Sequence, residues 1–148
     1  MYYFSYGSNM NINHLQDYIN STNTVVVGIG ELKNYIFKYQ TLKGYNCSKK
    51  KSKANIQQRI GSKVLGVVLK IDKNTEKKLD VKEGVAGKRY KRIYVNVKIC
   101  HKKYKCMCYV IDGPCIDWKP VKKYKKIIIK AGQQFNFPTS YIKRLNYL

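Results

Sequence analysis

The sequence predicts an α+β domain built on a mixed β-sheet that could curl into a small barrel with flanking helices. Length and composition support a folded domain, because 148 residues that are 44% hydrophobic can bury a substantial core. The order of the elements supports the class: strand, helix, several strands, helix, hairpin, helix, helix. Neither a repeat nor a linker interrupts this order, so we expect residues 1–148 to form a single domain.

The N-terminal half predicts five strands and one short helix. An aromatic run opens the chain and ends at the turn residues Gly7-Ser8-Asn9. Asn11 or Asn13 can then cap a helix that continues to Tyr18 or Ile19. Polar, lysine-rich Lys43–Lys53 is expected to form a surface loop. The expected strands are Tyr2–Tyr6, Thr24–Ile29, Asn34–Thr41, Ala54–Arg59 and Val64–Ile71, the last nearly continuous in apolar residues and so buried on both faces.

The C-terminal half predicts a hairpin between helices. Asp72 and its neighbours can open a helix to about Val81, and Gly84 is a natural terminator. Two strongly alternating segments enclose His101-Lys102-Lys103, which is the pattern of a β-hairpin. The remaining segments are the hairpin strands Tyr90–Cys100 and Tyr104–Ile111, a loop Asp112–Val121, a helix Lys122–Ala131, and a last helix from Pro138 to about Leu145.

The net charge of +22 is the most unusual global property. Thirty Lys and Arg residues against eight Asp and Glu residues will attract polyanions, including nucleic acid. The lysines are nevertheless spread along the chain, and an AT-biased genome produces the same composition. Both explanations stay open, and we expect any polyanion binding to be weak, non-specific and steeply dependent on salt.

Cysteine usage and hydropathy predict a cytoplasmic protein. The five cysteines are an odd number without zinc-type spacing, which is typical of reduced, buried thiols: Cys47, Cys100, Cys106, Cys108 and Cys115. No apolar segment is long enough to span a bilayer, and the N-terminus lacks the pattern of a signal peptide. We therefore expect no membrane partner.

The first candidate for chemistry is Tyr6-Gly7-Ser8-Asn9-Met10, directly after the first strand. A passage from strand to glycine turn can expose successive backbone N–H groups, which cradle a carboxylate or an oxyanion. Ser8 and Asn9 add side-chain donors. Taken locally, the same residues also fit an ordinary turn that ends a strand.

The second candidate is Glu83, expected at the end of a short helix beside apolar Val85. Partial burial would raise the pKa of such a carboxyl, which could then serve as both base and acid. A third candidate is the segment Tyr124–Ile128. Taken locally, Glu83 also fits an exposed surface glutamate, and Tyr124–Ile128 also fits an amphipathic helix with a solvated basic face. The histidines, His14 and His101, have no evident partner, so a nucleophilic triad is not expected.

Together these segments resemble the γ-glutamyl cyclotransferase family, also described as AIG2-like, nearly from end to end. "YFSYGSNM" at 3–10 resembles the family's substrate loop, and "KVLGVVLKID" at 63–72 resembles its central buried strand. "LDVKEGVAGKRYKRIYVNV" at 79–97 resembles the catalytic segment. "YKKIIIKAGQQFNFPTSYIKRL" at 124–145 resembles the C-terminal helix, loop and helix.

The resemblance implies a mixed barrel with surrounding helices and an enzyme that releases 5-oxoproline from a γ-glutamyl compound. It implies Glu83 as the catalytic acid/base and no metal or organic cofactor. A small γ-glutamyl molecule is the implied partner, and the oligomeric state stays open between monomer and homodimer. The implied substrate-binding residues are Tyr6, Gly7, Ser8, Asn9, Tyr90 and Tyr124.

Two departures from the family pattern lie where the leaving group is expected. Val121 and Lys122 stand where the family usually has a Ser-Pro pair, and the 43–53 segment is rich in lysine. These lysines could meet an anionic leaving portion of the substrate. Two alternatives to the enzyme are therefore kept: the same fold used to bind or process an anionic ligand such as a nucleotide or nucleic acid, and a basic structural protein without a site.

Overall fold

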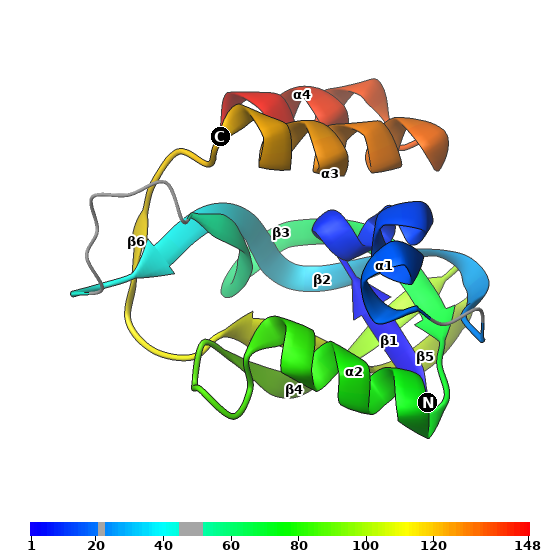
Figure 1. The fold of residues 1–148 in the computed structure, drawn as a ribbon. Helices are drawn as coiled ribbons and strands as arrows, with labels where there is room; N and C mark the ends of the chain where they lie inside the picture. The colour runs from blue at the N-terminus through cyan, green and yellow to red at the C-terminus, as the bar shows by residue number, and fades with distance from the viewer. Residues whose placement is uncertain (21–22, 45–51) are drawn as a thin grey trace.

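Five strands close into a mixed barrel in the computed structural model, which describes residues 1–20, 23–44 and 52–148 (Figure 1). The barrel order is β3-β1-β5-β4-β2, closed by pairing of β2 with β3, and β6 pairs with β2 outside the barrel. The β1–β5 pair is parallel and the others are antiparallel, as predicted for a mixed sheet. The strands are β1 (Tyr2–Ser5), β2 (Val25–Leu42), β3 (Lys53–Lys70), β4 (Tyr90–Ile99), β5 (Lys102–Ile111) and β6 (Cys115–Asp117).

Helices flank the barrel on two sides. In the described residues they are the 3₁₀ turn η1 (Ser8–Met10), α1 (Ile12–Ile19), α2 (Lys73–Glu83), α3 (Lys122–Gln134) and α4 (Thr139–Tyr147). Figure 1 shows α3 and α4 side by side on one side of the barrel and α2 on the opposite side. None of these helices in the described part of the chain is long and apolar enough to cross a membrane.

The separation of β2 and β3 into four shorter strands was wrong. Each is a single strand of 18 residues, because both strands continue past a shift in pairing register at Asn34 of β2 and residues 59–62 of β3. Asn34 and Gly61 both adopt positive φ there, and the Gly61 N–H donates to Asn34 Oδ1 over 3.1 Å. The prediction of a plain loop over 112–121 was also wrong, since β6 lies within it and pairs with the end of β2.

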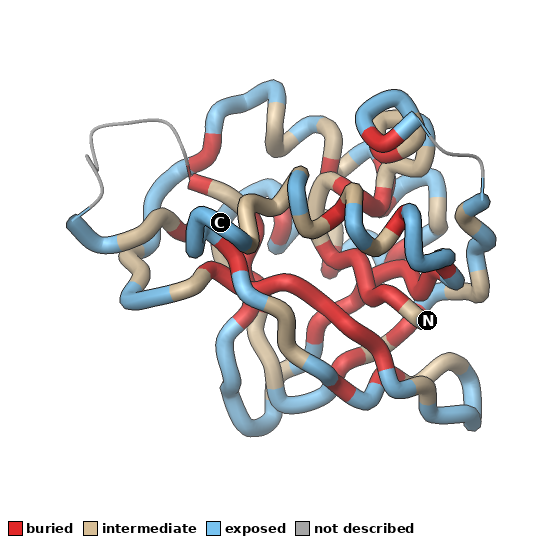
Figure 2. Tube along the Cα trace, turned by 60° about the horizontal axis from the view of Figure 1, so that its bottom comes forward, coloured by how far each residue is buried: buried red, intermediate tan, exposed pale blue. Residues whose placement is uncertain are grey.

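Burial follows the strands that carry the site. Figure 2 shows buried backbone through the middle of the molecule and exposed segments around it. Residues 64–69 of β3 are all buried, which confirms the prediction of a strand covered on both faces. β1 lies between β3 and β5, with Phe4 fully buried, so its end is held firmly where the chain enters η1.

An ion-pair network fixes α2 against the hairpin. The Arg92 guanidinium donates to both carboxylate oxygens of Asp80, over 2.8 and 2.5 Å, and to Glu76 Oε1 over 2.6 Å. The Tyr109 hydroxyl also donates to Asp80, over 2.7 Å. Burial raises the pKa of Asp80, but the hydrogen bonds from Arg92 and Tyr109 outweigh it, so that the net shift is downward. The network thereby sets where the last turn of α2, and Glu83 with it, lies.

Replacing Arg92 by Met should destabilise the protein by about 1–2 kcal/mol, because the paired carboxylates stay partly exposed and part of the Coulomb energy is screened. The pKa of Asp80 is lowered on folding, so the stability that it contributes is fully present above the unfolded pKa of about 3.9 and is lost as pH falls through the folded pKa. Denaturant unfolding at pH 7 and at pH 3 measures both effects. Lys91→Met, at an exposed neighbour on β4, is the control, and an equal loss for both variants would contradict the network's role.

The cysteines that the structure describes are free: Cys100, Cys106, Cys108 and Cys115. Cys47 lies outside the described residues. Cys106 and Cys108 are both fully buried, as adjacent same-face residues of β5, and burial raises the pKa of both thiols. They therefore behave as small core residues rather than as reactive thiols.

Candidate active site

The seven residues predicted for the site line one small pocket where β1 runs into η1. The pocket has a volume of about 40 Å³ and adjoins a larger pocket of about 460 Å³. The two pockets share four lining residues, so they meet at this point: Ser8, Glu83, Tyr90 and Tyr124. We call them the inner and the outer pocket. The inner one is lined by Tyr3, Ser5, Tyr6, Gly7, Ser8, Asn9, Ala54, Glu83, Tyr90, Tyr109 and Tyr124.

Glu83 is the last residue of α2 and the only carboxylate that lines either pocket within the described residues. Asp72 caps the start of the helix through the Thr75 N–H, and Gly84 ends it with φ of 69°, as the sequence predicts. The Glu83 side chain is 17% exposed. A buried carboxylate at a helix C-terminus faces the negative end of the helix dipole, so it needs compensating donors.

Asn9 and Lys82 supply that compensation. The Asn9 amide donates to Glu83 Oε1 and to the Tyr3 hydroxyl, over 2.9 Å in each case. Lys82, whose side chain is only 12% exposed, donates to Asn9 Oδ1 over 2.5 Å and lies 3.8 Å from Glu83 Oε1. The lysine therefore fixes which way the Asn9 amide faces, and the amide in turn holds one oxygen of Glu83 in place.

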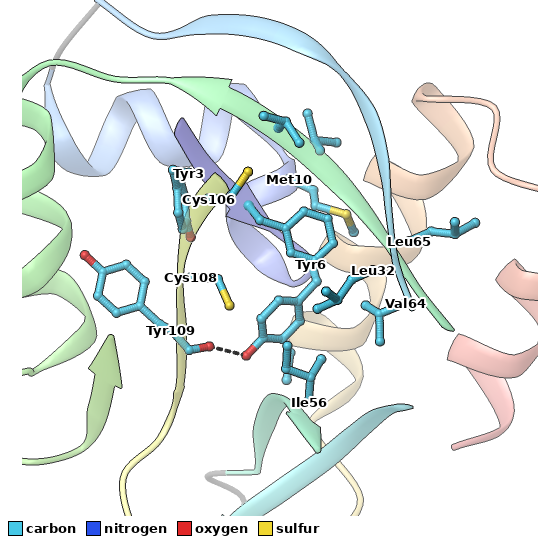
Figure 3. Close-up of a cluster of buried hydrophobic side chains, with 14 of the residues drawn as sticks. Tyr3, Tyr6, Met10, Leu32, Ile56, Val64, Leu65, Cys106, Cys108 and Tyr109 are labelled. Carbon is cyan, nitrogen blue, oxygen red and sulfur yellow. Dashed lines mark hydrogen bonds between the residues drawn. The ribbon is translucent and has the colours of Figure 1, made fainter. Parts of the chain in front are cut away.

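The tyrosines of the pocket act as neutral hydrogen-bonding groups. Tyr6 donates to the carbonyl oxygen of Tyr109, as Figure 3 shows, and Tyr90 donates to the carbonyl oxygen of Ala54 over 3.0 Å. The Tyr124 hydroxyl accepts from the Ala54 N–H over 3.0 Å. Burial raises the pKa of Tyr124 to about 12, and it raises those of Tyr6 and Tyr90 well above their ordinary value. At neutral pH these three phenols therefore stay protonated and uncharged.

Gly7 allows η1 to lie directly against β3. A β-carbon at this position would stand 2.8 Å from the Ala54 β-carbon and 3.8 Å from the Tyr124 hydroxyl oxygen. The first N–H groups of the following 3₁₀ turn have no acceptor within the turn. The predicted backbone cradle is thus compatible with the geometry, and the Tyr6 ring packs in the core against Phe37.

Several residues of the site were not predicted. Tyr3 and Ser5 point to the pocket from β1, and their alternation along the strand was the available signal. The Ser5 hydroxyl is buried and makes no hydrogen bond of normal geometry with the described residues, although it lies close to the Tyr3 hydroxyl. No feature of the sequence around Lys82 predicts that it belongs to the site. His14, expected to be without a partner, lines the outer pocket, where burial and then Lys82 lower its pKa.

Comparison with known proteins agrees with the fold and with the sequence resemblance. The model of the AIG2-like family matches residues 63–145, which is more than half of the chain. The gamma-glutamylcyclotransferase of Bos taurus is 27% identical over 146 residues, which cover 97% of this chain and 76% of that protein.

Solved structures give the same result. A gamma-glutamyl cyclotransferase structure superposes with a TM-score of 0.88 at 26% identity, covering 99% of this chain and 86% of the other. An uncharacterized protein from Homo sapiens superposes with a TM-score of 0.87 at 27% identity, covering 98% of this chain and 85% of that protein's chain. The predicted α+β barrel is confirmed by these matches. The chain belongs to the AIG2-like family and has the fold of the gamma-glutamyl cyclotransferases.

Proposed function

We propose that the protein is a γ-glutamyl cyclotransferase, which releases 5-oxoproline and a free amino acid or amine from a γ-glutamyl compound. One observation carries the proposal: a single, largely buried carboxylate, Glu83, lies where the inner and outer pockets meet. The Bos taurus gamma-glutamylcyclotransferase and the solved gamma-glutamyl cyclotransferase structure support the same class of enzyme. The free thiols of the described residues fit a reducing compartment such as the cytoplasm.

In the first step Glu83 accepts a proton from the substrate's α-ammonium group, which is not nucleophilic while it is protonated. The free amine then attacks the γ-carbonyl carbon of the same molecule, forming the new C–N bond of a five-membered ring. The pocket holds the substrate in the folded conformation that brings its amine nitrogen close to its γ-carbonyl carbon. Backbone N–H groups at residues 7–9, and the Ser5 hydroxyl, are suited to the substrate carboxylate or to the developing oxyanion.

In the second step the tetrahedral intermediate collapses and the original amide C–N bond breaks. The proton held by Glu83 passes to the departing amine, so one carboxyl serves first as base and then as acid. The leaving portion exits through the outer pocket, which Glu83 also lines. No water is consumed, and no cofactor is needed to balance the reaction.

Incubation with a panel of γ-glutamyl amino acids, peptides and amines tests the proposal, with chromatographic detection of 5-oxoproline. At least one compound should give 5-oxoproline and its free amine in equal amounts. Absence of 5-oxoproline from the whole panel would favour a binding function for the same pocket.

Asn9→Ala should lower kcat/KM by about 10–100-fold, because Glu83 and the Tyr3 hydroxyl lose their donor and Lys82 loses its acceptor. Stability should fall by about 1–3 kcal/mol for the groups left unsatisfied. Steady-state kinetics and thermal unfolding measure the two effects. Asn13→Ala, at an exposed position of α1, is the control, and equal kinetics for both variants would remove Asn9 from the catalytic arrangement.

The charge supports a second candidate, a site for an anionic ligand such as a nucleotide or nucleic acid. The chain carries a net charge of +22, and exposed lysines include Lys102, Lys103, Lys122 and Lys126. Such binding would be non-specific and would weaken steeply with salt. Titration of labelled single- and double-stranded DNA at two salt concentrations distinguishes the candidates. Tight, sequence-selective binding that persists at high salt would favour this function over the enzyme.

A further inference from the structure

The outer pocket is strongly cationic. Basic side chains reach its wall from separate segments: Lys53 from β3, Lys82 from α2, Arg89 from the turn before β4, and Lys123 from α3. Glu83 is the only carboxylate among the described residues of its lining. The inner pocket, by contrast, has no cationic residue in its lining within the part of the chain that the structure describes. The basic residues therefore line the outer pocket rather than the inner one, and Glu83 lies where the two pockets meet.

Most of this charge is not neutralised within the protein. Lys82 lies 3.8 Å from Glu83, and the described residues give no carboxylate within 4 Å of the other three basic groups. The Lys53 ammonium lies instead 4.3 Å from the centre of the Tyr124 ring. Burial lowers the pKa of Lys53, and the charges of Arg89 and Lys82 lower it further. These cations are close enough to repel one another, and an anion between them would relieve the repulsion.

The location of the charge relative to Glu83 indicates which part of a substrate meets it. A γ-glutamyl group carries one ammonium and one carboxylate, so it brings no net charge to the inner pocket. The bond to be broken lies beside Glu83, and whatever follows that bond extends into the outer pocket. Burial and then Lys82 lower the pKa of His14, so the positive charge of the outer pocket comes chiefly from its lysines and arginine.

We propose that the outer pocket selects γ-glutamyl compounds whose leaving portion carries at least two negative charges, such as an acidic amino acid with two carboxylates. The inference rests on the proposed cyclotransferase function and adds the class of leaving group to it. Lys53 and Lys82 contact the anion within the pocket, and Arg89 and Lys123 contact it at the exposed rim.

Three substrates test the proposal: γ-glutamyl-glutamate, γ-glutamyl-glutamine and γ-glutamyl-butylamine. Their leaving portions have similar reach and carry two, one and no carboxylates. We expect kcat/KM for 5-oxoproline release to fall in this order, with about 10–100-fold between the first two, the range expected for charge-assisted hydrogen bonds. The preference should shrink at 0.5 M salt, roughly the regime in which exposed charges are screened within a few ångströms.

A variant pair assigns the preference to the pocket. The double variant Arg89→Gln, Lys123→Gln removes the rim charges and should reduce the preference for glutamate over glutamine by about tenfold. The double variant Lys126→Gln, Lys130→Gln removes the same charge from exposed positions of α3 outside the pocket lining, and the preference should stay as in the unmodified protein.

Each outcome separates this inference from the function on which it rests. Equal kcat/KM for all three substrates would overturn the charge preference and leave the cyclotransferase function intact. An equal loss of preference in both double variants would assign it to overall charge and would also overturn the inference. If no compound yields 5-oxoproline, the proposed function fails and the inference fails with it.

Discussion

Glu83→Gln should abolish 5-oxoproline formation while the protein stays folded. Glutamine has nearly the same shape as glutamate, so it can keep the packing at the end of α2, but it cannot accept and return a proton. General acid/base groups contribute about 10²–10⁴-fold in rate. Because Glu83 acts first as base and then as acid, we expect a loss of rate at the upper end of this range or beyond it. Substrate affinity should largely survive, because the inner pocket's other groups stay in place.

His14→Gln is the matched comparison for this variant. His14 lines the outer pocket but not the inner one, and it is the other described side chain there that could accept a proton near neutral pH. Turnover, substrate affinity and thermal unfolding should be measured for both variants. Glu83→Gln activity near that of the unmodified protein, or a larger loss in His14→Gln, would show that the base has been assigned wrongly.

Gly66→Ala should have the largest effect on folding. Gly66 lies in β3 opposite β1, and a β-carbon there would stand 2.5 Å from the Ser5 carbonyl oxygen and 2.6 Å from the Phe4 ring. β1 is paired on both sides, so its backbone has little room to move away. Overpacking typically costs about 1–3 kcal/mol, and a clash with paired backbone should exceed this range.

Gly87→Ala separates this clash from the general effect of removing a glycine. Its nearest atom would be 3.7 Å from the new β-carbon, at the Gly84 carbonyl oxygen, which is an ordinary contact. Chemical unfolding of both variants should show a loss of 3 kcal/mol or more, or failure to accumulate folded protein, only for Gly66→Ala. Equal stability of the two would mean that β1 and β3 can separate more readily than the pairing indicates.

The parts of the site that the sequence predicts are those encoded by local signals. Asp72 and Gly84 are a helix cap and a helix terminator, so the end of α2 and the position of Glu83 could be predicted from a few residues. The hairpin of β4 and β5 follows from strong alternation on both sides of a short turn. That Tyr6–Asn9 lies beside Glu83 came from the family resemblance, because local sequence could not bring the two segments together.

What the sequence did not predict depends on contacts between distant segments. The hydrogen bond from Asn9 to Glu83 joins residues 74 positions apart. Lys82 donates to the same Asn9 side chain, so its place in the site depends on the same approach of distant segments. The lengths of β2 and β3 were missed because both strands continue past a shift in register, at Asn34 and around Gly61, where residues with positive φ usually end a strand. β6 is only three residues long and exists because the end of β2 offers it an edge.

We propose that Glu83 promotes conversion of a γ-glutamyl group into 5-oxoproline without consuming water. The most direct measurement is mass spectrometry of the products formed from γ-glutamyl-glutamate in water enriched in heavy oxygen, with the unmodified protein and with Glu83→Gln. The unmodified protein should release 5-oxoproline and free glutamate in equal amounts, with no heavy oxygen in either product, and Glu83→Gln should release neither. Heavy oxygen in the product of the γ-glutamyl group would instead show hydrolysis and contradict the account.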